Sequence, residues 1–283
     1  MDTIRDAQAL RQRLALWEAR DRTVGFVPTM GALHEGHLSL VRLAREWSER
    51  VVASVFVNPA QFGPNEDFAR YPRQPEKDAE MLASAGCDLL FLPEVETIYP
   101  PGHTAFVEPG GPAEGLEGAL RPGHFRGVAT VVSALFNLVR PDVAVFGKKD
   151  AQQVAVIRRM VRDLHFPVEI VAGETVREED GLALSSRNAY LSPDERRAAS
   201  VLFRALRAAG QAIAAGERRG DEVRRLMREV LDSEPLARTE YADVVDAETF
   251  QPVDALVGSL ALPLAVRIGR TRLIDNFQLV AGD

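Results

Sequence analysis

The order of hydrophobic and polar positions predicts strands and helices that alternate through the first half of the chain. The apolar stretch 24–27 is followed by a periodic segment in which Leu40, Ala44 and Trp47 share one helical face. The run 51–57 is continuously apolar and rich in β-branched residues, as in a central strand that is covered on both faces. Together these segments predict a strand–helix–strand unit.

The same alternation continues to about residue 164. It predicts helices at 75–85, 128–139 and 151–164, and strands at 88–92 and 143–146. Nearer the N-terminus, Leu10, Leu14 and Trp17 predict a helix, and Thr3 with Asp6 have the form of a capping box at its start. Strands that alternate with helices indicate a parallel, doubly wound sheet, so we predict an α/β, Rossmann-like N-terminal domain.

The pattern changes after residue 176. Ser192, Pro193 and Glu195 predict the start of a helix that is rich in alanine and arginine. A further helix is expected at 221–231, and strands are expected at 241–245, 264–268 and 272–277, with a hairpin turn at Gly269 and Arg270. We therefore expect two domains, a Rossmann-like ligand-binding domain over 1–175 and a smaller α+β lid domain over 176–283.

A long linker lies between Pro109 and Gly127. It holds six glycines and is also broken by Pro112 and Pro122. Because connections of this length inside a compact domain usually have a function, we predict that this linker is a mobile loop or lid.

Composition and charge restrict the classes of function. With 46% hydrophobic residues, 7% aromatic residues and a net charge of -7, the chain has the composition of an ordinary globular protein. The negative charge argues against a general binder of nucleic acids or membrane surfaces. No apolar run approaches the roughly 20 residues of a membrane span, so we expect a cytoplasmic protein. Cys87 is the one cysteine, which excludes an internal disulfide and a cysteine-based zinc cluster.

The first candidate site is the loop 30–37, which follows the first predicted central strand. Ligands of parallel sheets bind outside the carboxyl ends of the strands, and the N–H groups of a helix start attract phosphate. His34 and His37 are spaced to converge on one ligand. Neither the P-loop pattern nor the Gly-x-Gly-x-x-Gly pattern occurs in the sequence, so this loop is the candidate phosphate site. The alternative is a polar loop with two solvated histidines.

The second candidate site is the lysine pair Lys148 and Lys149, two of the three lysines in the chain. The pair follows a predicted strand and opens a helix, which places two positive charges at the positive end of the helix dipole. Asp150 can cap this helix, and Gln153 lies about one turn further on and faces the same opening. These features predict an anion site, and the alternative is an exposed turn.

The third candidate site is the serine cluster Leu184, Ser185, Ser186 and Arg187. Two hydroxyl groups and a guanidinium group suit the oxygens of a phosphate. A solvated turn is the alternative for this cluster when it is considered alone.

The His-x-Gly-His pattern is similar to the motif of class I aminoacyl-tRNA synthetases and small nucleotidylyltransferases, which attack the α-phosphorus of ATP. Together with the segment 57–62, the three clusters resemble the pantoate–β-alanine ligase family over essentially the whole chain. The resemblance implies that ATP and (R)-pantoate form pantoyl adenylate and pyrophosphate, and that β-alanine then gives pantothenate and AMP. It also implies Mg²⁺ with the ATP and a homodimer.

The resemblance implies a role for each matching residue. His37 corresponds to the proton donor, His34 to its phosphate-binding neighbour, and Lys149 to a third catalytic group. The implied ATP contacts are Met30, Gly31, Ala32, Leu33, His34, Glu35, Gly36, His37, Gly147, Lys148, Lys149, Asp150, Val176, Leu184, Ser185, Ser186 and Arg187. The implied substrate contacts are Gln61 and Gln153 for pantoate, with Gln61 also near β-alanine, and Asn58 and Tyr71 as weaker matches.

One departure from the family pattern is Leu184, where many members have methionine. This exchange is conservative. No cluster of Asp or Glu in the sequence identifies metal ligands, so the metal residues stay unassigned.

Two other functions remain open from the sequence. A nucleotidylyltransferase that acts on a phosphate ester would share the histidine motif but would need a basic pocket for its second phosphate. Gln61 and Gln153 favour a neutral polyol acid over such an ester. A nucleotide sensor that does not turn over ATP is the other possibility, and pyrophosphate release that depends on a carboxylic acid would exclude it.

Overall fold

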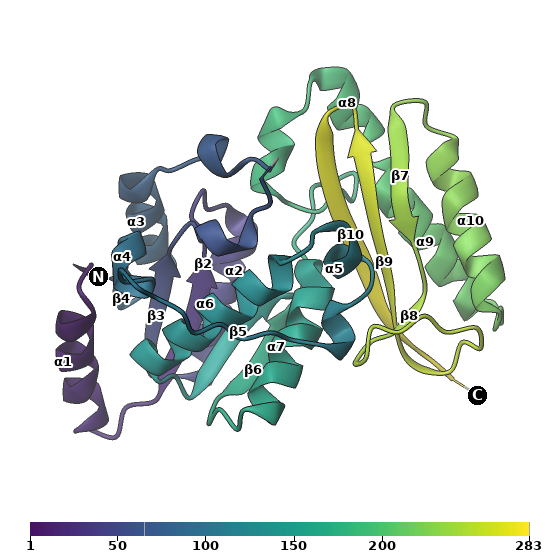
Figure 1. Cartoon of the computed structure of the whole chain (residues 1–283). Helices are drawn as coiled ribbons and strands as arrows, with labels where there is room; N and C mark the ends of the chain where they lie inside the picture. Colours follow the sequence, from purple (N-terminus) through teal and green to yellow (C-terminus); the bar gives the residue numbers. More distant parts are fainter. Residues whose placement is uncertain (65, 283) are drawn as a thin grey trace.

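The computed structural model describes residues 1–64 and 66–282 and contains two sheets. A six-stranded parallel sheet lies in the N-terminal part, and a four-stranded antiparallel sheet lies in the C-terminal part (Figure 1). Within the described residues, no helix combines the length and the apolar character that crossing a membrane requires.

The parallel sheet and its helices confirm the doubly wound α/β prediction. Its strands follow the order β1-β4-β3-β2-β5-β6, and each pair of neighbouring strands is parallel. The strands are β1 (Asp2–Ile4), β2 (Val24–Thr29), β3 (Arg50–Val55), β4 (Leu89–Phe91), β5 (Val143–Gly147) and β6 (Glu169–Gly173). The helices of this part are α1 (Ala7–Glu18), α2 (Glu35–Trp47), α3 (Pro75–Ser84), α4 (Val95–Ile98), α5 (Glu117–Leu120), α6 (His124–Val139) and α7 (Ala151–Asp163).

Alternate residues along the strands of this sheet pack into two separate cores. Phe26 and Val52 pack with residues of α1, α6 and α7. Val27 and Ala53 pack with residues of α2 and α3 on the other face. Burial on both faces explains why the central strands are apolar without interruption.

The strand order places a ligand crevice between β2 and β5. From β2 the sheet grows through β3 to β4 on one side, whereas β5 and β6 lie on the other side. Open parallel sheets bind ligands at the carboxyl ends of the strands where the order reverses in this way. The histidine loop follows β2 and the lysine pair follows β5, so the topology brings these two motifs together.

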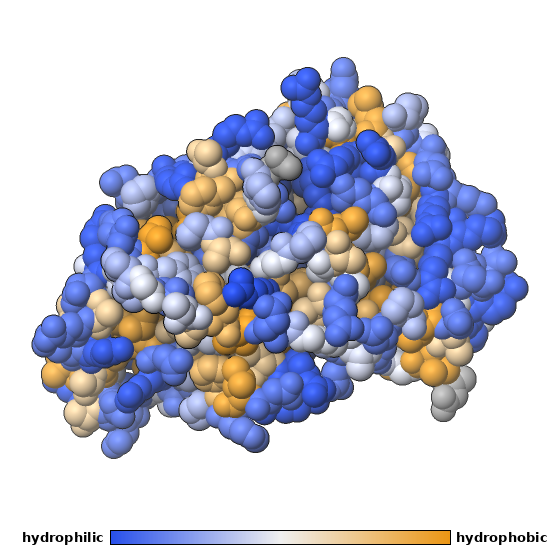
Figure 2. Space-filling view, viewed as in Figure 1, coloured by the Kyte–Doolittle hydropathy of each residue, from blue (hydrophilic) through white to orange (hydrophobic). Residues whose placement is uncertain are grey.

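The second sheet confirms a smaller α+β domain at the C-terminal end. Its strands are β7 (Ala237–Ala242), β8 (Val245–Asp246), β9 (Gly258–Ile268) and β10 (Thr271–Ala281), and the accompanying helices are α8 (Pro193–Ala198), α9 (Val201–Ala214) and α10 (Gly220–Asp232). Helix α10 buries Val223, Met227 and Leu231 against this sheet. Hydrophilic side chains cover the outer side of α10 (Figure 2). The boundary between 1–175 and 176–283 stays a prediction.

Two local signals in the second domain are confirmed. The Oγ of Ser192 accepts the N–H of Glu195, and the Glu195 carboxylate accepts the N–H of Ser192, which completes a capping box at the start of α8. Gly269 and Arg270 form the turn between β9 and β10. Gly269 has a φ of 57°, in the left-handed region that favours glycine.

One prediction near the N-terminus is wrong. Thr3 does not cap α1, because it lies in β1 and pairs with Leu90 at the edge of the sheet. Asp6 is the cap instead, and its carboxylate accepts the N–H of Ala9 at 2.8 Å. Trp47 lies in α2 as expected, is its last residue and is 48% exposed.

The linker between Pro109 and Gly127 contains the short helix α5 and the first residues of α6, and its role as a functional loop or lid stays a prediction. Helix α6 begins at His124 rather than at residue 128, so Gly127 is helical. A Cβ atom on Gly127 would lie 2.3 Å from the carbonyl oxygen of Ala60. This glycine therefore serves the close approach of α6 to the turn that carries Gln61.

Candidate active site

A cavity of about 1260 Å³ lies at the carboxyl ends of β2 and β5 and extends toward the second sheet. Most of the predicted site residues line it. These are Met30, His34, Gly36, His37, Asn58, Gln61, Tyr71, Gly147, Lys149, Asp150, Gln153, Val176, Leu184, Ser185 and Arg187. The remaining predicted residues, which do not line it, are Gly31, Ala32, Leu33, Glu35, Lys148 and Ser186.

The two histidines form a capping box at the start of α2. Nδ1 of His34 accepts the N–H of Gly36 at 3.2 Å, and Nδ1 of His37 accepts the N–H of His34 at 3.3 Å. The ring centroids lie 4.1 Å apart. The motif therefore has a structural role in the helix in addition to any contact with a ligand.

Both histidines are neutral near pH 7. Burial, with a further contribution from the charge of Lys149, lowers the pKa of His34 to about 4. Burial and then His34 and Lys149 lower the pKa of His37 to about 3. Because each Nδ1 accepts a backbone N–H, the proton of each ring lies on Nε2, which is able to donate a hydrogen bond. In the free protein the neutral His37 ring can therefore donate a hydrogen bond, and its implied role as proton donor stays a prediction.

The loop between Met30 and His34 is shaped by Asp78, which sequence reasoning missed. Its carboxylate accepts the N–H of Ala32 at 3.0 Å and the N–H of Leu33 at 2.9 Å. Asp78 is only 1% exposed, in the first turn of α3. Gly31 and Ala32 both have left-handed backbone conformations. These residues therefore set the course of the loop and do not face the cavity.

Glu35 and Lys148 do not line the cavity. Glu35 is exposed and pairs with Arg42, and Lys148 pairs with Glu174. Lys149 is the member of the lysine pair that lines the cavity. Asp150 occupies the cap position of α7, but its side chain makes no capping hydrogen bond, so that part of the prediction is wrong.

Gln61 is held in place by Asn58. Nδ2 of Asn58 donates to Oε1 of Gln61 at 2.9 Å and to the carbonyl of Gly127 at 3.1 Å. Oδ1 of Asn58 accepts the hydroxyl of Tyr99 at 2.8 Å. Since these contacts occupy a side chain that is 1% exposed, Asn58 orients Gln61. Gln153, which is half-buried, lines the same cavity.

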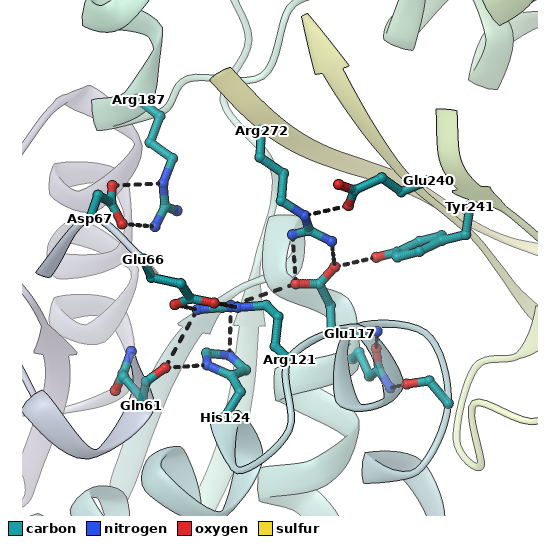
Figure 3. Close-up of polar contacts among 12 residues, drawn as sticks. Gln61, Glu66, Asp67, Glu117, Arg121, His124, Arg187, Glu240, Tyr241 and Arg272 are labelled. Carbon is teal, nitrogen blue, oxygen red and sulfur yellow. Dashed lines mark hydrogen bonds and ion pairs between the residues drawn. The ribbon is translucent and has the colours of Figure 1, made fainter. Parts of the chain in front are cut away.

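A buried carboxylate that the sequence did not indicate connects α5 to the second sheet. Glu117 is 6% exposed and accepts hydrogen bonds from Arg272 of β10 at 2.9 Å and from the Tyr241 hydroxyl of β7 at 2.8 Å (Figure 3). Nothing in a local pattern could reveal this contact, because Arg272 lies 155 residues further along the chain.

Arg187 pairs with Asp67 across the cavity. Nε and Nη2 of Arg187 donate to the two carboxylate oxygens at 3.3 and 3.2 Å (Figure 3). The N–H of Arg187 also donates to Oγ of Ser185 at 3.3 Å. Arg187, which is predicted to bind phosphate, therefore pairs with a protein carboxylate in this structure.

Comparison with known proteins gives one consistent family. The model of the family described as pantoate-beta-alanine ligase matches residues 2–278. A pantothenate synthetase from Moorella thermoacetica is 53% identical over 283 residues, which is 100% of both chains. Another from Heliobacterium modesticaldum is 58% identical over 260 residues, which is 92% of each chain.

Solved structures agree with this assignment. The crystal structure of pantothenate synthetase from Thermus thermophilus has a TM-score of 0.93 and 51% identity, with full coverage of both chains. The pantoate-beta-alanine ligase of Francisella tularensis, described as complexed with beta-gamma ATP and beta-alanine, has a TM-score of 0.78 and 34% identity over 98% of this chain and 97% of that chain. The chain therefore belongs to the pantoate–β-alanine ligase family, and it is an enzyme of the ligase class.

Proposed function

We propose that this ligase performs its ATP-dependent condensation of pantoate with β-alanine through a pantoyl adenylate. The pantoate carboxylate attacks the α-phosphorus of ATP, and the bond to pyrophosphate breaks. The β-alanine amine then attacks the acyl carbon, loses a proton, and expels AMP to leave pantothenate. The observation that carries this proposal is that His34, His37, Lys149 and the two glutamines Gln61 and Gln153 line one cavity where the strand order reverses.

In the first step the histidines and Lys149 stabilise the departing pyrophosphate. Their donors point into a partly buried site, where fixed hydrogen bonds and charges act more strongly than in water. The neutral state of His34 and His37 suits donation of hydrogen bonds from Nε2, whereas Lys149 supplies the positive charge. In-line positioning of the carboxylate and the phosphorus supplies the remaining rate acceleration.

The glutamines select the acid. Carboxamide groups can donate to a carboxylate and can both donate to and accept from hydroxyl groups, so they suit a polyol acid without adding charge. Gln61 lies against Met30 with its Nε2 atom 3.1 Å from the sulfur, on the histidine side of the cavity. This position also suits contact with the incoming β-alanine. An acyl adenylate hydrolyses readily, and a second domain that limits access of water would protect it.

We propose that Mg²⁺ arrives as part of the nucleotide substrate. Over residues 1–64 and 66–282, no group of three or more His, Cys, Asp or Glu side chains is arranged to hold a metal ion. Magnesium commonly keeps water and phosphate oxygens as ligands in nucleotide sites, and it would neutralise charge on the phosphates here.

The test is exchange of isotopically labelled pyrophosphate into ATP. We expect exchange that requires pantoate and does not require β-alanine, because the first step is reversible. Acetate in place of pantoate is the control for acid specificity. No exchange with pantoate would overturn the proposal, and exchange driven by a phosphate ester instead would favour the nucleotidylyltransferase alternative.

The expected homodimer and cytoplasmic location are part of the same proposal. Both rest on the family resemblance. Sedimentation velocity tests the first, with a single species of monomer mass as the contradicting result, and cell fractionation tests the second.

A further inference from the structure

Asn276 of β10 contacts the turn that carries the lysine pair. Its Nδ2 atom donates to the carbonyl oxygen of Lys148 at 2.8 Å and to that of Lys149 at 2.9 Å. Asn276 is 5% exposed, and both protons of its amide are used in these two bonds. A residue of the second sheet therefore fixes the backbone from which the Lys149 side chain extends.

The preceding residue holds a second segment of the site. The Asp275 carboxylate is almost fully buried and accepts two hydrogen bonds from Arg177, at 2.6 and 2.9 Å. Arg177 also donates to the carbonyl of Gly181 at 3.0 Å, within the hairpin that leads to the serine cluster. Two adjacent residues of β10 thus connect to the lysine turn and to the segment before Ser185.

We propose that Asn276 is a positioning residue for Lys149, through which the C-terminal sheet sets the geometry of the phosphate-binding side of the site. This inference rests on the proposed function, since it assumes that Lys149 acts on the phosphates. Lysine carries a point charge on a flexible four-carbon stem, so the placement of its backbone limits where the charge can lie. A shift of about 1 Å in such a group can lower a rate by about 100-fold.

The chemistry of the contact requires asparagine. A single NH₂ group can donate to two neighbouring carbonyl oxygens at short range. Aspartate has the same shape but no donor when ionised, so it would bring negative charge against two carbonyl dipoles. Asn276→Asp therefore removes both hydrogen bonds and adds a buried charge, whereas Asn276→Ala removes the hydrogen bonds without adding charge.

The test compares Asn276→Asp and Asn276→Ala with Gln278→Ala. Gln278 lies two residues further along β10, carries the same amide group, and is exposed, so it is the matched control. We expect Asn276→Asp to lower kcat of the pantoate-dependent exchange by about 10- to 100-fold. Asn276→Ala should have a smaller effect and Gln278→Ala none. Asn276→Ala adds no charge, so it stays informative if the aspartate variant does not fold.

A second measurement separates positioning from general stability. If Asn276 acts through Lys149, Asn276→Asp should cost less than about threefold in a Lys149→Ala background, because coupled residues are not additive. Equal losses in both backgrounds, or wild-type activity of Asn276→Asp, would overturn the inference. If the wild-type protein itself showed no exchange, the proposed function would fail. ATP affinity measured by calorimetry would then test Asn276 separately, with weaker binding by Asn276→Asp expected and unchanged binding contradicting it.

Discussion

His34 and His37 together cap the start of α2, and the N–H of His34 donates to Nδ1 of His37 at 3.3 Å. In an ordinary capping box a serine or threonine and a glutamate perform this task. Here the two ligand-facing histidines perform it, which directs Nε2 of each ring away from the helix backbone. The cap therefore fixes both the tautomer and the direction of the groups that we assign to ATP.

Substitution of His37 should separate these two roles. His37→Ala removes the cap acceptor and the Nε2 donor, so we expect a loss of about 1 kcal/mol in the free energy of unfolding. We also expect a loss of about 100- to 1000-fold in single-turnover adenylation, as for loss of one transition-state donor. His37→Gln can accept the cap hydrogen bond and should recover the stability without recovering the rate. Urea unfolding and quenched-flow measurements would show this split, and wild-type adenylation by His37→Ala would exclude the role.

Stability should fall in mild acid because three histidines resist protonation. Burial is the main cause that lowers the pKa of His34 to about 4, of His37 to about 3 and of His124 to about 4. In the unfolded chain these groups take up protons near their ordinary pKa of about 6.5. The unfolded state therefore binds more protons in this range, and the folded state loses stability as the pH falls from about 6.5 toward 4.

Histidine NMR signals provide the measurement for this pH effect. Of the five histidines in the chain, these three should stay neutral at pH 5.5, where the folded protein is still populated. The midpoint of urea unfolding should decrease between pH 7 and pH 5. Ordinary titration of His34 and His37 near pH 6.5 would contradict the expectation and would restore the possibility of a cationic acid.

Loss of the Glu117 charge should destabilise the protein more than loss of one of its neutral partners. Glu117→Gln would remove the bidentate acceptor of Arg272, which keeps its ion pair with Glu240, so we expect a cost of about 1.5 to 3 kcal/mol. Tyr241→Phe removes one hydrogen bond to the same carboxylate and should cost about 1 kcal/mol. Urea unfolding of both variants measures the difference. Equal small effects would show that the contact of α5 with the second sheet adds little stability.

Removal of the Asp67 charge should improve ATP binding. In the structure the guanidinium of Arg187 already has a carboxylate partner, so phosphate oxygens must compete with Asp67. A partly exposed pair contributes about 0.5 to 1 kcal/mol, which corresponds to a two- to fivefold lower KM for ATP in Asp67→Asn. Arg187→Ala is the comparison and should raise KM. A higher KM in Asp67→Asn would indicate that Asp67 assists closure of the site.

Much of the fold followed from local patterns. The continuous apolar runs predicted β2, β3 and β5, and the capping signals at Ser192 and Glu195 placed α8 correctly. Strand β1 escaped prediction because its three residues, Asp2–Ile4, are too few for a period to appear. The extent of β9 and β10 was underestimated, since β9 begins before Pro263, at Gly258, and β10 continues beyond Phe277 to Ala281.

The sequence by itself determined the strand–loop–helix context of the histidine loop and the lysine pair, because these features depend on short-range periodicity and on helix dipoles. It also determined the chemical types at the site, from which the family resemblance followed. Tertiary structure alone decided which members face the cavity: Lys149 does, whereas Lys148 pairs with Glu174. It alone revealed Asp78, Glu117 and Asn276, whose partners lie far away in the sequence. Such contacts depend on how elements distant in the sequence pack against one another, and no local pattern of residues encodes that packing.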